Sequence, residues 1–261
     1  MLVFLFSITM FLWQKQQKAA ANDIYGKAFE LATAAKPEVL SPVPATEDPI
    51  PDAEPQWVAA PLEGDPHIQT LADMDLDALR QVNPQVIGWI LIPDTAVNYP
   101  LMQGDDNEYY LKLTWDYKKN ASGSIFLEHL NSPDLTDFNT IVYGHNMNDG
   151  SMFAGLRKYR DQAYLEEHPY VYIRSDQGVY RYEIFSSYLA KVESNTYGLG
   201  FSSEASRNQF LRQTIADSVI DTGIQPAPTD RILTLSTCSG SGYSTRWVVH
   251  ARLKMIPAEC S

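Results

Sequence analysis

Short runs of β-branched and aromatic residues, separated by Gly, Pro, Asn or Asp, dominate the hydrophobic pattern of this chain. Such runs are typical of β-strands, and the residues between them are typical of turns. Eight strands are predicted, at residues 86–92, 97–102, 124–127, 140–143, 170–174, 179–192, 231–235 and 247–255. The long helical connections that a parallel sheet needs are mostly absent. The pattern therefore predicts a mainly β fold, a closed eight-stranded β-barrel.

Helical periodicity occurs in three places within this region. Residues 74–80 predict a short helix before the first strand, and residues 152–159 predict a helical insertion. Residues 204–219 predict a longer amphipathic helix in the loop before the penultimate strand. Its apolar face consists of Phe210, Leu211, Ile215 and Val219. We expect one folded domain over residues 67–261.

The N-terminus has a different pattern. Residues 2–13 form an apolar run that predicts a membrane anchor. Twelve helical residues cover about 18 Å, whereas a hydrocarbon core is about 30 Å thick. Lys15 and Lys18 follow the run instead of preceding it, so we expect that further residues precede this start. A cleaved signal peptide and a buried N-terminal helix are the alternatives.

Two segments separate this anchor from the domain. Residues 14–35 are rich in Gln, Lys and Ala and predict a helical stalk. Residues 36–66 contain eight prolines and carry a net charge of −6, from Lys36 and seven acidic residues. Such a segment cannot bury enough apolar surface to fold. We therefore expect an extended acidic linker that holds the domain away from a membrane surface.

The net charge and the number of cysteines argue against several classes of protein. A net charge of −12 over 261 residues argues against nucleic acid as a partner, because a nucleic-acid-binding protein needs a basic surface. The two cysteines, Cys238 and Cys260, make neither a disulfide framework nor the ligand set of a structural zinc site. We expect no disulfide between them, because that bond would consume the reactive thiol proposed below.

The candidate chemistry lies at the ends of three predicted strands. Cys238 follows the strand at residues 231–235, and Arg246 precedes the last strand. Together they suit a nucleophile beside a cation that stabilises an oxyanion. His145 follows a third strand and is the candidate acid–base partner of the thiol. The alternative is a buried cysteine that packs as a small hydrophobic residue.

Several motifs in a fixed order resemble a known family. They are residues 143–147 (Tyr-Gly-His-Asn-Met), 149–153 (Asp-Gly-Ser-Met-Phe) and 234–238 (Thr-Leu-Ser-Thr-Cys) with Arg246, and also 86–90, 106–111 and 123–127. Over residues 75–253 the chain resembles the class B sortases, cysteine transpeptidases of Gram-positive cell surfaces. Some sortases have an acidic residue two places after the nucleophile, where this chain has Gly240. We therefore assign no acid as a third catalytic residue.

The resemblance implies a sortase-type β-barrel in which the inserted helix helps to wall the substrate groove. It also implies a mechanism in which Cys238 attacks the Thr carbonyl of a C-terminal sorting signal, and His145 and Arg246 assist. Asn107 and Tyr197 match positions that line the class B groove. Ser236, two residues before Cys238, lies on the same strand face and is expected to bind substrate. We assign only structural roles to His129, His168 and His250.

The expected partners are a sorting-signal peptide, an amine of peptidoglycan or of its precursor, and the plasma membrane. The membrane is contacted through a single N-terminal span that leaves the catalytic domain outside the cell. No cofactor or metal is expected. Two alternatives remain: a pilin-polymerising sortase that uses a Lys acceptor, and a non-enzymatic surface-binding barrel.

Overall fold

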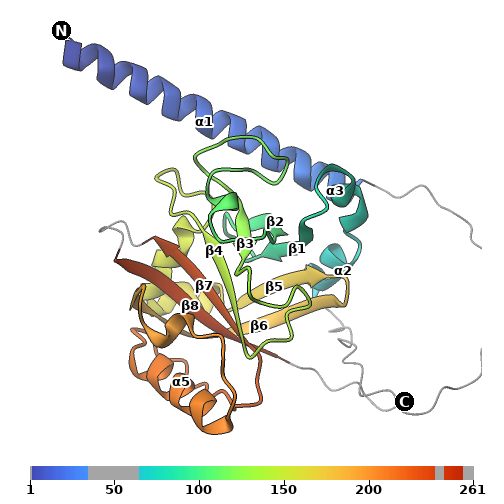
Figure 1. Cartoon of the computed structure of the whole chain (residues 1–261), viewed down its shortest axis with the longest axis vertical. Coiled ribbons are helices and arrows are strands. Elements are labelled where there is room, and N and C mark those ends of the chain that lie inside the picture. The colour runs from blue at the N-terminus through green and yellow to red at the C-terminus, as the bar shows by residue number, and fades with distance from the viewer. Residues whose placement is uncertain (1, 35–64, 239–243, 255–261) are drawn as a thin grey trace, which may run out of the picture.

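Eight strands form the centre of the molecule, a computed structural model that describes residues 2–34, 65–238 and 244–254 (Figure 1). They are β1 (Val86–Leu91), β2 (Asn98–Met102), β3 (Ile125–Leu127), β4 (Asn139–Gly144), β5 (Tyr170–Ser175), β6 (Gly178–Lys191), β7 (Ile232–Cys238) and β8 (Thr245–Leu253). They close into a barrel in the order β1-β2-β3-β4-β7-β8-β6-β5. The predicted mainly β barrel is thus confirmed.

Two of the strand pairs are parallel, β2 with β3 and β4 with β7, and the others are antiparallel. The β4–β7 pair lies deep in the barrel wall, where Ile141, Val142, Leu233 and Leu235 are fully buried. Continuous apolar runs such as these are typical of strands that are buried on both faces. The main core contains large, fully buried side chains that include Trp89, Phe126, Phe153 and Tyr182.

The short helices differ in detail from the predictions. The helix expected at residues 74–80 is α3 (Leu76–Val82), and Asp75 caps it by accepting a hydrogen bond from the Ala78 N–H. The insertion expected at residues 152–159 is the 3₁₀ helix η2 (Ala154–Arg160). Two helices, α2 (Pro66–Ala72) and α4 (Gln162–Glu167), were not predicted. Each is a single short segment with little apolar periodicity to reveal it.

The longer inserted helix is α5 (Glu204–Ala216), which precedes β7 as predicted. Its residues Phe210 and Leu211 pack against Phe185 and Ile232. The predicted end at residue 219 is wrong. Val219 has left the helix, its N–H donates to the Ser187 carbonyl of β6, and its side chain is 57% exposed.

The N-terminal helix α1 (Leu2–Thr33) spans 32 residues, and its second half packs on the barrel. The buried residues Ala21, Ile24, Tyr25, Ala28 and Ala32 recur at helical spacing and join the main core. Figure 1 shows this half beside α3 and the β1–β2 edge, while the first half projects away from the barrel. Residues 14–35, expected to be a stalk, are therefore packed on the domain over much of their length.

Side chains of the loop between β2 and β3 attach α1 to the barrel. Trp115 Nε1 donates to the Ile24 carbonyl at 3.1 Å, and Asn120 Nδ2 donates to the Gln17 carbonyl at 3.1 Å. None of the helices in the described ranges has a segment long and apolar enough to span a bilayer. Most of the predicted linker, residues 36–64 of 36–66, lies outside the described residues.

Candidate active site

Three strands bring the predicted catalytic residues to one edge of the barrel. β4 and β7 are parallel with Gly144 opposite Thr237, so the next residues, His145 and Cys238, follow at the same edge. β8 runs antiparallel to β7 and places Arg246 opposite Cys238. The side chain of Cys238 lies outside the described part of the structure, as do residues 239–243, which include Gly240.

A glycine is required where β4 approaches its neighbours before His145. A Cβ atom at Gly144 would lie 2.5 Å from Ile125 Cδ1 and 2.7 Å from the ring of Phe153. Carbon atoms do not approach this closely without displacement, so a side chain here would move the strand end or its neighbours. Gly144 therefore sets the position of the backbone from which His145 projects.

A backbone carbonyl holds the imidazole of His145. The ring Nε2 lies 2.6 Å from the carbonyl oxygen of Leu111, the last residue of the 3₁₀ helix η1 (Tyr109–Leu111). Because a carbonyl only accepts, Nε2 carries the proton in this contact, and the neutral ring then has its lone pair on Nδ1. The His145 carbonyl also accepts from the Phe153 N–H at 2.9 Å. His145 is thus oriented through both its ring and its backbone.

Arg246 places a positive charge at the same edge. Its side chain is half-buried, and Nη1 donates to the Thr245 carbonyl at 3.0 Å. The charge acts on the neighbouring Tyr143. Burial raises the pKa of the Tyr143 hydroxyl, the Glu128 carboxylate raises it further, and Arg246 acts in the opposite direction. The edge that carries Cys238 is therefore within reach of a cation, as the chemistry of an oxyanion site requires.

The three predicted substrate residues gather at this edge as well. Tyr197, in the 3₁₀ helix η3 (Asn195–Tyr197), has its hydroxyl 3.0 Å from Ser236 Oγ on β7. Its ring stacks on that of Tyr143, with centroids 6.5 Å apart and planes inclined by 18°. Asn107, from the β2–β3 loop, donates through Nδ2 to Glu128 Oε2 at 2.6 Å. The structure thus joins all three through Tyr143 and Glu128.

Comparison with known proteins agrees with this geometry. The family model for the sortase domain matches residues 90–254. The chain belongs to the sortase family. Sortase B of Listeria monocytogenes is 38% identical over 164 residues, which cover 63% of this chain and 67% of that protein. Sortase B of Staphylococcus aureus is 34% identical over 179 residues, which cover 68% of this chain and 73% of that protein.

Solved structures lead to the same family. A Staphylococcus aureus sortase B–substrate complex matches with a TM-score of 0.66 and 32% identity, covering 73% of this chain and 87% of that one. The predicted resemblance to class B sortases is thus confirmed, and so is cysteine transpeptidation as the type of activity. The alternative of a non-enzymatic barrel is wrong for a member of this family.

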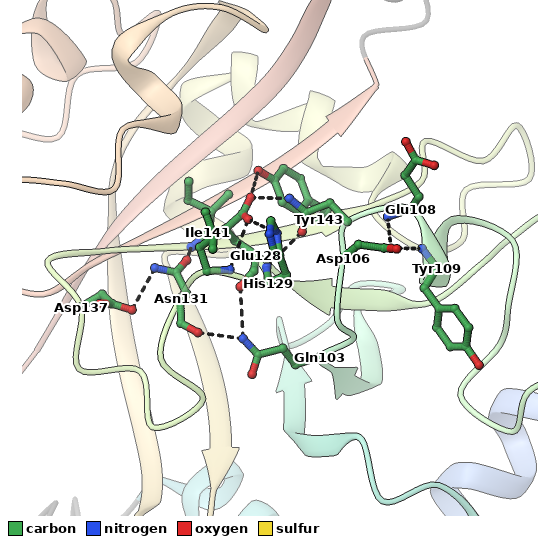
Figure 2. Close-up of polar contacts among 12 residues, drawn as sticks. Gln103, Asp106, Glu108, Tyr109, Glu128, His129, Asn131, Asp137, Ile141 and Tyr143 are labelled. Atoms are coloured by element: carbon green, nitrogen blue, oxygen red, sulfur yellow. Dashed lines mark hydrogen bonds and ion pairs between the residues drawn. The ribbon is translucent and has the colours of Figure 1, made fainter.

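Two residues of this sortase site were not singled out from the sequence. Tyr143 donates its hydroxyl to Glu128 Oε2 at 2.9 Å, and Glu128 is only 6% exposed (Figure 2). Both lie in motifs that carry the family resemblance or border them. Glu128 directly follows the apolar strand β3, and an acidic residue next to a buried run was the available signal. Its partners come from distant parts of the chain, which sequence spacing does not show.

The remaining histidines of the sortase domain have protein partners. His168 Nδ1 lies 3.1 Å from the Pro93 carbonyl, and His250 is fully buried. His129 Nδ1 is 2.7 Å from Glu128 Oε1 beside the site, and its structural role stays a prediction. Within the described residues, no three His, Cys, Asp or Glu side chains are grouped so as to hold a metal.

A cavity of about 490 Å³ lies between η3 and α5, next to the site of the sortase. Its lining consists of Asn195, Gly198, Gly200, Phe201, Ser206, Gln209 and Gln213. α5 therefore forms one side of a hollow next to Tyr197, the residue that contacts Ser236.

Proposed function

We propose that this sortase cleaves the C-terminal sorting signal of a surface protein after Thr and transfers the acyl group to an amine of peptidoglycan or its precursor. The supporting observation is the register of three strands. β8 places Arg246 opposite Cys238 of β7, and β4 pairs Gly144 with Thr237, so that His145 and Cys238 follow at the same edge. The similarity to a sortase B solved with its substrate supports a peptide substrate.

In the first half-reaction the Cys238 thiolate attacks the carbonyl carbon of Thr in a pentapeptide of the Asn-Pro-x-Thr or x-Pro-x-Thr-Gly type. The C–S bond forms while the carbonyl π electrons move to oxygen, and the guanidinium of Arg246 stabilises that oxyanion. The C–N bond then breaks, and His145 gives its proton to the leaving amine. The products are a thioacyl-enzyme and the released C-terminal fragment.

In the second half-reaction the acceptor amine attacks the thioester carbonyl, and His145 removes a proton from the attacking nitrogen. The C–S bond breaks as the amide forms, which restores the Cys238 thiolate and protonated His145. The half-reactions together exchange one amide for another and need no oxidant or reductant. Water in place of the amine gives hydrolysis as the side reaction.

The role of Arg246 is tested with a fluorogenic sorting peptide. We expect Arg246→Ala to lower kcat by about 10²- to 10³-fold, the usual cost of losing one oxyanion contact. Arg252→Ala is the matched control, because Arg252 lies on the same strand but pairs with Glu183. A kcat for Arg246→Ala within threefold of the parent would contradict the assignment.

We also propose that the catalytic domain works at the outer face of the plasma membrane, with residues 2–13 contributing to the anchor. The apolar composition of this run and its continuity with α1 support the proposal. Protease added to protoplasts should digest the domain. Full protection of the domain until the protoplasts are lysed would contradict this topology.

A further inference from the structure

A buried carboxylate lies behind the half-buried residues of the site. Glu128 Oε2 accepts from the Tyr143 hydroxyl at 2.9 Å (Figure 2). The same oxygen accepts from Asn107 Nδ2 at 2.6 Å. The second oxygen, Oε1, lies 2.7 Å from His129 Nδ1 and accepts from the Leu130 N–H at 3.4 Å. Asn107 and Tyr143 are themselves half-buried, so they stand between the carboxylate and solvent.

This arrangement fixes the direction of the hydrogen bonds at the site. The Tyr143 hydroxyl donates its single proton to Glu128 Oε2, so it offers only lone pairs to any other partner. Asn107 is held at both ends of its amide, because its Oδ1 accepts from the His129 N–H at 3.0 Å. Among the described residues, one N–H and one lone pair of that amide have no partner. Both side chains therefore present defined donors and acceptors to a ligand.

The same network reaches the strand of the nucleophile. Tyr143 stacks on Tyr197, and the Tyr197 hydroxyl contacts Ser236 Oγ. Ser236 also lies opposite Tyr143 in the β4–β7 register, two residues before Cys238. Three successive side-chain contacts, Glu128–Tyr143, Tyr143–Tyr197 and Tyr197–Ser236, thus link the carboxylate to the strand of the nucleophile.

A buried carboxylate is by itself weak evidence for a role in stability, because apolar replacements of similar volume are often neutral or stabilising. We propose that Glu128 is a positioning residue for the sorting peptide: it holds Asn107 and Tyr143 in the orientation that binds the peptide for attack by Cys238. This inference rests on the proposed peptide substrate.

The test compares Glu128→Met, which keeps the volume, with Glu128→Gln, whose oxygen can still accept from Tyr143 and Asn107. We expect kcat/KM for a sorting peptide to fall by on the order of 100-fold in Glu128→Met, the scale of a small misplacement of reacting groups. Glu128→Gln should recover at least tenfold of that loss. Glu183→Gln is the matched control, a partly buried carboxylate paired with Arg252 away from the site.

Two measurements distinguish a positioning role of Glu128 from a general disruption of the site. Alkylation of Cys238 by iodoacetamide, which needs no peptide binding, should stay within twofold of the parent in both Glu128 variants. In a background of Asn107→Ala and Tyr143→Phe, Glu128→Met should cost less than threefold, because its effect passes through those two side chains. The inference would be overturned if a Glu128 variant lost alkylation rate and peptide cleavage equally. It would also be overturned if Glu128→Met cost as much in the Asn107→Ala and Tyr143→Phe background as it does in the parent.

The remaining outcomes also test the inference or the proposed function. If both Glu128 variants fail to fold, the carboxylate serves stability and the inference is wrong. If the parent cleaves the peptide and both variants match its kcat/KM, only the inference fails. If the parent cleaves no member of an x-Pro-x-Thr library, the proposed function fails, and the inference fails with it.

Discussion

At the scale of single residues, His250 shows how a buried side chain ties several strands of the barrel together where α5 packs on them. Its ring is fully buried on β8, with Nδ1 2.9 Å from Thr234 Oγ1 and Nε2 3.2 Å from the Tyr188 hydroxyl. Thr234 donates its own proton to Asn139 Oδ1 at 2.6 Å, so it accepts from the imidazole, and Nδ1 carries the hydrogen. The network therefore ties together β4, β7, β8 and β6 around a neutral imidazole.

This environment predicts a pH dependence of stability. Burial lowers the pKa of His250 from its ordinary value of 6.5 to about 3. The unfolded chain takes up a proton below pH 6.5 and the folded chain does not, so stability is constant above that pH and falls as the pH decreases toward 3. Between pH 7 and pH 5 this one group should cost about 2 kcal/mol of unfolding free energy.

Urea unfolding at pH 7, 6 and 5 checks this prediction in the parent and in His250→Gln, which retains hydrogen-bonding groups but does not titrate. The parent should lose more stability than the variant by about 2 kcal/mol over this range. Parallel pH profiles for the two proteins would show that His250 is protonated equally in the folded and unfolded states.

At the scale of elements, the end of β4 decides where His145 lies. We expect Gly144→Ala to destabilise the fold by about 1–3 kcal/mol, because the new methyl group overlaps Ile125 and Phe153. Peptide cleavage should fall by at least about tenfold, since the displaced strand carries the imidazole with it. Gly155→Ala is the control, because its nearest neighbour would be the Tyr164 hydroxyl at 3.9 Å. Wild-type cleavage by Gly144→Ala would contradict this role for the strand end.

Elements were predictable where the local pattern determines them. All eight strands follow from apolar runs bounded by turn residues, although β7 runs three residues past its predicted end, to Cys238, and β8 begins at Thr245, before its predicted start at 247. Helix ends were less predictable because single contacts set them. The start of α2 at Pro66 depends on the Asp65 side chain, which accepts from the His67 N–H, within a segment whose prolines predicted an extended chain.

The site was predictable only in part for a related reason. Cys238, His145 and Arg246 lie in motifs, and strand alternation identified Ser236. Asn107 and Tyr197 come from separate parts of the chain, and they are joined to each other by Glu128 and Tyr143. Glu128 contacts Asn107 and Tyr143, and Tyr143 stacks on Tyr197. Such long-range hydrogen bonds depend on barrel closure, which local sequence spacing does not encode.

At the scale of the whole molecule, the second half of α1 packs on the barrel and is part of the catalytic domain. Residues 21–32 dock on the barrel, and residue 21 lies only about 12 Å along the helix from residue 13, the end of the apolar run. A membrane-inserted run would therefore keep the barrel close to the bilayer. This replaces the expectation that residues 36–66 alone set that distance.

Truncation of α1 tests its contribution to the fold. We expect deletion of residues 1–33 to remove at least about 3 kcal/mol, because Ile24 and Tyr25 lose their burial and Trp115 is uncovered. The Tm should fall by about 6–12 °C. Deletion of residues 1–16 is the control and should leave the Tm within about 2 °C, since it retains the docked half. Equal Tm values for the two truncations would contradict the docking of α1.

The central claim, transpeptidation through a thioacyl-enzyme on Cys238, is tested most directly by intact mass spectrometry. The enzyme is mixed with a sorting peptide and then with an acceptor, either a peptidoglycan-type amine or a Lys side chain. We expect the parent mass to rise by that of the peptide segment ending in Thr, and the adduct to disappear as an amide product forms with the preferred acceptor. Cys238→Ala should form neither. An adduct in Cys238→Ala, or product from the parent with no adduct at any time, would contradict the mechanism.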